Sequence, residues 1–200
     1  MIIELFGLSR AGKTTYKEEL LSKGYNTIKE PIDIIKSLYF LKFFIKNPIN
    51  TFYFFYKLNS SYLKLQKFSI INYIKMILMR NSYLLGVLAK CEQAINMKGN
   101  VIVDEFSTQS IFMILQKKSS EEEIKKLLQK LPKSDRIYIL EIDEKTRYER
   151  FKKTRFPAQW IEKEYAQNWM KNSEFNYKII KKCLKGFDKP KSKLINQSSS

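Results

Sequence analysis

Near its amino terminus the chain reads Gly7-Leu8-Ser9-Arg10-Ala11-Gly12-Lys13-Thr14-Thr15, which matches the pattern G-x-x-x-x-G-K-[ST]. The six residues before it are apolar enough for a buried parallel strand, and residues 16–23 after it predict a helix that ends at Gly24. A strand, a glycine-rich loop and a helix in this order are the context in which the pattern binds phosphate. The sequence therefore predicts a phosphate-binding loop at the carboxyl end of the first strand.

The residue types at the constrained positions of this loop suit phosphate chemistry. Gly7 and Gly12 permit backbone conformations in which successive N–H groups point towards phosphate oxygens. Lys13 supplies a positive charge, and the hydroxyl of Thr14 can bind Mg²⁺ beside the β- and γ-phosphates of a nucleotide. The residues expected to bind the nucleotide are Gly7, Ser9, Arg10, Ala11, Gly12, Lys13, Thr14 and Thr15.

The composition of the 200 residues limits the class of protein. A net charge of +17 suggests an anionic partner, namely phosphates, nucleic acid or an acidic membrane surface, but the lysines are scattered, which is typical of a solvated surface. Because histidine is absent, a general base must be a carboxylate and a bound metal a hard, oxygen-bound ion. Cys91 and Cys183 lack partner spacing, so we expect reduced, buried thiols. With no signal peptide or membrane span in the sequence, we expect one cytoplasmic domain over residues 1–200.

Carboxylates follow two of the predicted strands. Residues 25–30 predict a second strand that ends at Glu30, and residues 101–103 predict a third strand followed by Asp104 and Glu105. Because ligands of open α/β sheets bind outside the carboxyl ends of the strands, these side chains should lie beside the phosphate loop. We expect Asp104 to bind Mg²⁺ directly or through water. Glu30 could accept a proton from a substrate hydroxyl, with a solvated glutamate as the alternative.

Residues 32–98 predict a helical region that is rich in aromatic side chains between residues 39 and 62. Pro48 and the run Asn59-Ser60-Ser61 are expected to divide it into about four helices. The stretch Phe52-Tyr53-Phe54-Phe55-Tyr56 is apolar on all sides, and we interpret it as core. A substrate pocket, a dimer face and a basic-aromatic membrane contact are the alternatives.

Two other features of this helical region are specific. Ile34, Leu38, Leu41 and Ile45 are spaced 4, 3 and 4 residues apart, which predicts an amphipathic stripe. Arg80 is the one arginine of the region and a candidate for binding a substrate phosphate, with a surface arginine as the alternative.

The chain after the third predicted strand alternates again between helices and strands. The polar run 107–110, which includes Gln109, should lie at the crevice and be followed by a helix at 111–117. Ser120 begins a capping box that opens a helix ending at Lys130. A fourth strand is predicted at 136–142 and a short last strand at 193–196.

A basic helix is predicted from Glu144, with Asp143 as its cap. Arg147 and Arg150 lie three residues apart and so on one face, and Arg155 follows closely. Because arginine is scarce in this chain and its guanidinium group is suited to phosphate, we interpret residues 144–160 as a mobile lid that closes on phosphate. A solvated basic helix is the alternative. A further helix, anchored by Trp160 and Trp169, precedes the last strand, and residues 197–200 would contact adenine.

Five strands that alternate with helices predict an α/β protein with a parallel, doubly wound sheet. The assembled motifs resemble the thymidylate kinase family, within the wider group of P-loop nucleoside and nucleoside-monophosphate kinases. The resemblance rests on four segments, 6–15, 27–31, 101–110 and 137–155. It covers both ends of the chain, and the phosphate loop is its most specific part.

This resemblance implies a P-loop kinase fold and transfer of the γ-phosphoryl group of ATP·Mg²⁺ to a nucleoside monophosphate such as dTMP. Thr14 and Asp104 would bind Mg²⁺. The catalytic residues that it implies are Arg10, Lys13, Glu30, Asp104, Arg150 and Arg155. The acceptor would be bound by Glu30, Arg80, Glu105 and Gln109.

Glu105 is the main departure, because the family has at this position an arginine that is expected to contact substrate phosphate. A kinase of a nucleoside, a sugar or another metabolite is therefore a second interpretation. A third is a nucleotide-binding regulatory or nucleic-acid-associated protein, although the basic residues do not gather on one recognisable motif. A homodimer is a further alternative that the sequence leaves open.

Overall fold

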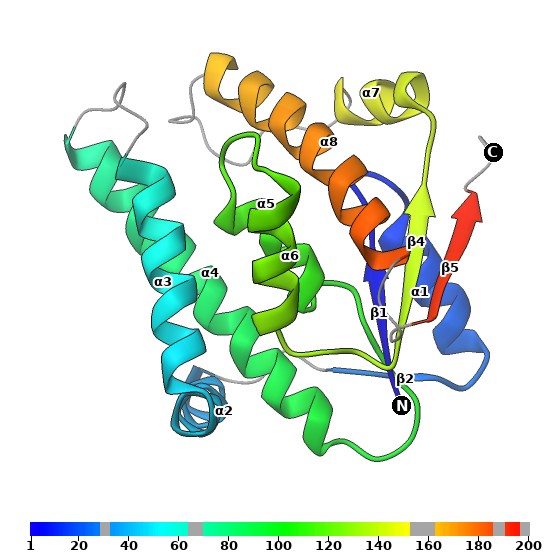
Figure 1. Ribbon diagram of the computed structural model, residues 1–200. Helices are drawn as coiled ribbons and strands as arrows, with labels where there is room; N and C mark the ends of the chain where they lie inside the picture. Colours follow the sequence, from blue (N-terminus) through cyan, green and yellow to red (C-terminus); the bar gives the residue numbers. More distant parts are fainter. Residues whose placement is uncertain (29–32, 64–69, 153–162, 186–190, 197–200) are drawn as a thin grey trace.

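The chain forms an α/β fold around one sheet, as the computed structural model shows (Figure 1). Five strands are hydrogen-bonded in the order β2-β3-β1-β4-β5, and all four pairings are parallel. The predicted fold class and the parallel direction of the sheet are therefore confirmed. The strands are β1 (Ile2–Phe6), β2 (Asn26–Thr27), β3 (Val101–Val103), β4 (Arg136–Glu141) and β5 (Lys191–Asn196).

Helices connect the strands and form a large lobe on one side of the sheet (Figure 1). The residues that the structure describes are 1–28, 33–63, 70–152, 163–185 and 191–196. The helices among them are α1 (Lys13–Ser22), α2 (Asp33–Lys46), α3 (Pro48–Leu63), α4 (Ile70–Asn96), α5 (Ser107–Ile114), α6 (Glu121–Lys130), α7 (Glu144–Lys152) and α8 (Lys163–Lys185).

Hydrophobic layers cover both faces of the sheet, because side chains alternate along each strand. Ile3 and Leu5 of β1 point to the face that is covered by α1, where they pack with Leu20. Phe6 points to the opposite face, where its ring stacks on Phe112 of α5 and on Tyr177 of α8. The sheet is therefore buried on both sides, as its short apolar strands require.

Several local predictions are confirmed. The side chain of Ser120 accepts a hydrogen bond from the backbone N–H of Glu123, and Asp143 accepts one from that of Thr146 at the start of α7. Cys91 and Cys183 are both free and buried. Within the described part of the chain, no helix is long and apolar enough to cross a membrane.

The predicted break at Asn59-Ser60-Ser61 is wrong, because α3 continues through these residues. Their side chains bond to the preceding turn of the same helix: the amide of Asn59 donates to the carbonyl of Phe55, and the hydroxyls of Ser60 and Ser61 donate to that of Lys57. Such bonds let short polar side chains remain inside a helix. The predicted break rested only on the tendency of asparagine and serine to occur in turns.

Two predicted helix starts are also wrong by several residues. Helix α1 begins at Lys13 and not at residue 16, since Gly12 forms its N-cap. Helix α5 begins at Ser107 and not at residue 111, so the polar run that was expected to precede the helix is its first turn, in which Ser107, Thr108 and Ser110 are buried.

The amphipathic stripe of α2 faces away from the core. Phe43 is the buried residue of this helix, whereas Ile34, Leu38, Leu41 and Ile45 are exposed. The aromatic run of α3 divides similarly: the prediction of a core position holds for Phe54 and fails for Phe52 and Tyr56. Helices α2 and α3 thus carry apolar side chains on two opposite sides.

Candidate functional site

The predicted phosphate loop lies between the carboxyl end of β1 and the amino end of α1. Arg10 and Gly12 both have positive φ angles, 69° and 85°, on either side of Ala11. Alternation of left-handed and other conformations turns successive backbone N–H groups towards one concavity, which binds anions. Hydrogen bonds from Ala11 N to Leu8 O (3.2 Å) and from Tyr16 N to Gly12 O (3.0 Å) fix the turn.

The amino end of α1 has no side-chain cap among the described residues. By contrast, Ser120 caps α6 and Asp143 caps α7. An uncapped helix terminus leaves backbone N–H groups and the positive end of the helix dipole available for an anion. Thr14 and Thr15 lie in this first turn and are exposed. The loop and the first turn of α1, residues 7–15, are called the phosphate side below.

Gly7 is required by its close approach to the neighbouring strand. A Cβ atom at this position would lie 2.8 Å from the backbone oxygen of Leu140 and 3.3 Å from the Cβ atom of Ala11. Backbone in that position cannot move aside as the end of a flexible side chain can. The first glycine of the motif therefore lets the loop pack closely against β4, while Gly12 adopts the left-handed conformation that glycine tolerates best.

The ammonium group of Lys13 folds back over the loop, where it donates to the carbonyls of Gly7 (2.9 Å) and Leu8 (3.1 Å). Burial lowers the pKa of Lys13 to about 8, while the charges of Glu105 and Asp104 act in the opposite direction. These two carboxylates therefore lie within electrostatic reach of the phosphate side. The structure thus brings the end of β3 next to the loop, as the sequence predicted.

Asp104 is the carboxylate that the sequence assigns to Mg²⁺. Its Oδ2 atom lies 3.2 Å from the Nζ atom of Lys17, which is one turn further along α1 than Lys13. Thr14 and Asp104 offer a hydroxyl and a carboxylate, which are oxygen donors of the kind that Mg²⁺ prefers. Mg²⁺ usually takes only one or two protein ligands and fills its other positions with water and phosphate oxygens, so this small donor set fits the ion.

Glu105 lies on the wall of a cavity. It lines a pocket of about 170 Å³ together with residues of α2 and α4. Tyr83 of α4 forms a side-chain hydrogen bond with Glu105, and burial followed by the charge of this carboxylate raises the pKa of Tyr83. We call this cavity the acceptor pocket, after the acceptor that the sequence analysis expects Glu105 to bind; its lining residues are Asp33, Lys36, Tyr83, Gly86, Val87, Lys90 and Glu105.

Arg80 lies on α4 one turn before Tyr83 and is half-buried. Its charge lowers the pKa of Tyr83, so the guanidinium group is close to the Tyr83 and Glu105 pair. The Nε atom of Arg80 is buried and has no hydrogen-bond partner among the described residues. A buried polar atom without a partner is costly, so Arg80 has unused capacity to donate a hydrogen bond at this site.

Gln109 links the phosphate side to a buried residue that the sequence analysis missed. Its side-chain oxygen accepts a hydrogen bond from Gly7 N (3.3 Å), and its own backbone N–H donates to Glu4 (3.1 Å). Glu4 is fully buried in β1 and also accepts a hydrogen bond from the hydroxyl of Thr108 (2.8 Å). Burial raises the pKa of Glu4 to about 7, although these hydrogen bonds lower it. The signal in the sequence was a single carboxylate inside an otherwise apolar strand.

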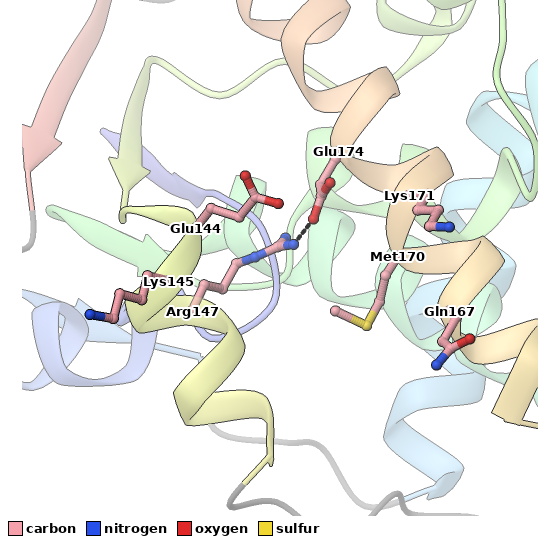
Figure 2. Close-up of a pocket in the computed structure, with 7 residues that line it drawn as sticks. All are labelled: Glu144, Lys145, Arg147, Gln167, Met170, Lys171 and Glu174. Atoms are coloured by element: carbon pink, nitrogen blue, oxygen red, sulfur yellow. Dashed lines mark hydrogen bonds and ion pairs between the residues drawn. The ribbon is translucent and has the colours of Figure 1, made fainter.

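The two arginines of α7 have different partners, although both were expected on one phosphate-facing side. The Nη1 atom of Arg150 lies 3.5 Å from the backbone oxygen of Arg10, so it reaches the phosphate side. Arg147 is buried and forms an ion pair with Glu174 of α8, as Figure 2 shows. This pair lies in a pocket of about 700 Å³ between the two helices, which is lined by Glu144, Lys145, Arg147, Gln167, Met170, Lys171 and Glu174.

Two predicted catalytic residues, Glu30 and Arg155, lie outside the described residues, as does Trp160. The predicted contact of residues 197–200 with adenine also lies outside them. Trp169 of α8 is described, and its indole N–H donates to the carbonyl of Phe112 (3.3 Å). The structure therefore brings together the phosphate side, Asp104, Glu105, Arg80, Gln109 and Arg150.

No protein-family model matches this chain, and no curated protein sequence matches it. Among solved structures it is similar to deoxyadenosine kinase from M. mycoides with bound dATP, with 24% identity, 98% of this chain and 91% of that chain covered, and a TM-score of 0.44. It is also similar to thymidylate kinase from Candida albicans (19% identity, 98% and 82% covered, TM-score 0.46) and to that from Ehrlichia chaffeensis (17%, 100% and 88%, TM-score 0.43). These are nucleoside and nucleotide kinases, the group that the sequence resembles.

Proposed function

We propose that this protein is a kinase that transfers the γ-phosphoryl group of ATP to a small acceptor of the nucleoside or nucleotide type. The observation that carries the proposal is the phosphate side: a loop with two left-handed residues opens an uncapped helix, with Lys13 and two carboxylates beside it. Backbone N–H groups, an ammonium group and a carboxylate for Mg²⁺ are the parts that phosphoryl transfer from a nucleotide requires.

In this reaction an oxygen of the acceptor forms a bond to the γ-phosphorus, and the bond from phosphorus to the bridging oxygen breaks, so ADP leaves. The proton of an acceptor hydroxyl goes to a carboxylate. Lys13 and the loop amides would bind the β- and γ-phosphates, and Arg10 and Arg150 would neutralise charge on the transferring group. Bound Mg²⁺, held by Thr14 and Asp104, would supply further positive charge at these phosphates.

The acceptor pocket is where the proposal divides into two forms. By resemblance, the acceptor is a nucleoside monophosphate such as dTMP, and Arg80, whose charge reaches Tyr83 of the pocket wall, supports a phosphate beside the pocket. Glu105 supports the other form, in which the acceptor presents a neutral hydroxyl group, because a carboxylate beside an acceptor phosphate is repulsive. Glu30 would bind the acceptor in both forms.

The test is transfer of label from γ-labelled ATP with Mg²⁺ to nucleoside monophosphates, nucleosides and sugars, which are then separated by chromatography. Lys13→Ala should abolish transfer to the preferred acceptor. Lys98→Ala is the matched control, since Lys98 is exposed and precedes β3, at the amino-terminal ends of the parallel strands and away from the loop. Label in dTDP supports the nucleotide form, and label in a nucleoside or sugar supports the second form. ATP binding with no labelled acceptor would contradict the kinase proposal.

A further inference from the structure

Helix α7 has little apolar surface with which to pack on the rest of the molecule, because six of its nine residues are charged. Most helices in proteins are held in place by burial of an apolar face. Arg147 is nevertheless buried, with 8% of its side chain exposed, and its guanidinium group forms an ion pair with Glu174 of α8 (Figure 2). A contact between two charged side chains therefore attaches α7 to α8.

Helix α8 is fixed against the start of the phosphate side. The ring of Tyr177 stacks on that of Phe6, which directly precedes the loop, and the two ring centroids are 5.5 Å apart. The hydroxyl of Tyr177 donates to the backbone oxygen of Leu140 (3.3 Å), the same atom against which Gly7 is packed. Glu174 lies three residues before Tyr177 and so on the same side of α8. Its carboxylate therefore has a defined position relative to the loop.

Polar side chains attach α8 to the body of the molecule as well. The side-chain N–H groups of Trp169, Asn172 and Asn176 each donate to a backbone carbonyl within residues 112–117, at 3.3, 3.0 and 2.9 Å. Asn176 is fully buried. Buried polar groups whose hydrogen bonds are satisfied rigidify a structure and specify one arrangement of it. Glu174 therefore lies in a part of α8 that is attached both before and after it.

Arg150 follows Arg147 by three residues, so the two guanidinium groups start from neighbouring positions on α7. The Nη1 atom of Arg150 lies 3.5 Å from the backbone oxygen of Arg10. A contact of this length is at the limit of a hydrogen bond, so it contributes little to holding α7. The ion pair of Arg147 is the stronger of the two contacts, because both of its groups are charged. The position that this pair gives to α7 therefore decides whether Arg150 reaches the loop.

Glu144 shows why the carboxylate has to come from α8. It lines the same pocket as the ion pair. Burial lowers the pKa of Arg147, whereas the charge of Glu144 raises it. Glu144 belongs to α7 itself, however, so it can balance the charge of Arg147 but cannot attach α7 to another element. Glu174 does both.

We propose that Glu174 is a positioning residue: it holds Arg147, and with it α7, in the place from which Arg150 reaches the phosphate side. Without this carboxylate, Arg147 would be a buried charge without its counter-charge on α8, and movement of α7 towards water would relieve that cost. Arg150 would move with the helix. The effect on phosphoryl transfer rests on the proposed function, whereas the position of α7 does not.

The first experiment measures kcat and KM of the full chain with the acceptor that the wild type phosphorylates. Glu174→Gln should lower kcat by about 10²-fold, the effect of a misplacement of about 1 Å, with little change in KM for the acceptor. Arg150→Ala should lower kcat too, and the double variant should be no slower than Arg150→Ala alone, because both changes remove the same effect. An unchanged kcat in Glu174→Gln, or losses that multiply in the double variant, would overturn the proposal.

Glu144→Gln is the matched control, because it removes a carboxylate from the same pocket and keeps the ion pair with α8, so its kcat should equal that of the wild type. A reversed pair keeps the proposal testable if Glu174→Gln fails to fold. Arg147→Glu combined with Glu174→Arg restores an ion pair between the two helices and should keep kcat within about tenfold of the wild type. If this folded variant were as slow as Arg150→Ala, Arg147 itself would be needed at the phosphates, and the role given to Glu174 would be wrong.

A distance measurement separates this proposal from the kinase proposal. Glu149→Cys on α7 and Glu18→Cys on α1 place exposed thiols for spin labels, while both native cysteines are buried. Double electron–electron resonance of the labelled chain should give one narrow distance distribution, which Glu174→Gln shifts or broadens and Glu144→Gln does not. A wild type without turnover would contradict the kinase proposal alone. An unchanged distance distribution in Glu174→Gln would overturn the positioning role.

Discussion

The phosphate side and the acceptor pocket meet at Asp104 and Glu105, but they are built in different ways. The phosphate side is nine consecutive residues, and its shape depends on backbone: two left-handed residues, a glycine against Leu140, and hydrogen bonds within the loop. The acceptor pocket is assembled from side chains of α2, α4 and the end of β3. A site made of backbone is specified by a short motif, whereas a site made of distant side chains depends on how helices pack.

The largest effect is expected at Arg10, on the phosphate side. Arg10→Ala should lower kcat by on the order of 10³ with little change in stability, because the guanidinium group would stabilise the transferring phosphoryl group. Alanine keeps a Cβ atom at this left-handed position, so the backbone strain is unchanged. Steady-state kinetics of the variant measure the effect.

The control for Arg10 is Arg136→Ala, since Arg136 is exposed at the beginning of β4, at the amino-terminal ends of the strands and away from the loop. Its kcat should equal that of the wild type. An Arg10→Ala enzyme with a kcat within about tenfold of the wild type would refute the role assigned to this arginine.

The next effect concerns Glu4, which supports the phosphate side through Gln109. Its pKa is about 7 in the folded chain, above the ordinary value of 4.5, so the folded state binds more protons than the unfolded state between these pH values. The free energy of unfolding should therefore decrease as pH rises from about 4.5 to 7, by about 3 kcal/mol, and this contribution should change little above pH 7.

Glu4→Gln removes the titrating group, so its free energy of unfolding should lack this decrease. Urea denaturation of both proteins at pH 5 and pH 8 measures the difference. Equal pH dependence of the wild type and the variant would show that Glu4 does not titrate in this range.

Substitution of one glycine on each side, Gly7 of the phosphate side and Gly86 of the acceptor pocket, should change stability by smaller amounts and compares the two sites directly. Gly7→Ala would place Cβ 2.8 Å from the backbone oxygen of Leu140, and we expect a loss of about 2 kcal/mol in stability together with loss of ATP binding. Gly86→Ala would place Cβ 3.0 Å from Cε of Lys36, a side chain that can move. Because alanine favours the helix, this variant should gain up to about 1 kcal/mol.

Thermal or urea denaturation of the two glycine variants, with a nucleotide-binding assay, tests this contrast. Gly86→Ala should bind ATP as the wild type does, while its KM for the acceptor changes, since Gly86 lines the acceptor pocket. Equal loss of stability in both variants would mean that the acceptor side is as rigid as the loop.

The smallest effect connects the two sides. The charge of Glu105 raises the pKa of Lys13 against the effect of burial, which brings that pKa to about 8. Glu105→Gln should therefore lower the pKa of Lys13 further. Since the protonated ammonium group would bind phosphate in the proposed function, the affinity for ATP should begin to decrease at a lower pH in the variant than in the wild type. The pH dependence of the dissociation constant of ATP measures this shift. An unchanged profile would show that the charge of Glu105 does not influence the pKa of Lys13.

The sequence by itself determined the order of strand, loop and helix around residues 7–15, the α/β class and the caps of α6 and α7, because each depends on residues that are close in the chain. The same local reasoning failed at Asn59-Ser60-Ser61, where bonds to the preceding turn keep α3 continuous. It also missed Glu4, whose partners Thr108 and Gln109 are more than 100 residues away.

Only the tertiary structure decided how the remaining residues are used. Arg147 and Arg150 are three residues apart on one helix. Arg147 forms an ion pair with Glu174 of α8, whereas Arg150 lies beside the backbone oxygen of Arg10 in the loop. The amphipathic stripe of α2 has the periodicity of a core helix, but Phe43 takes the core position and the stripe is left exposed. Periodicity reports that a helix has an apolar side, whereas the packing of the other helices decides which side is covered.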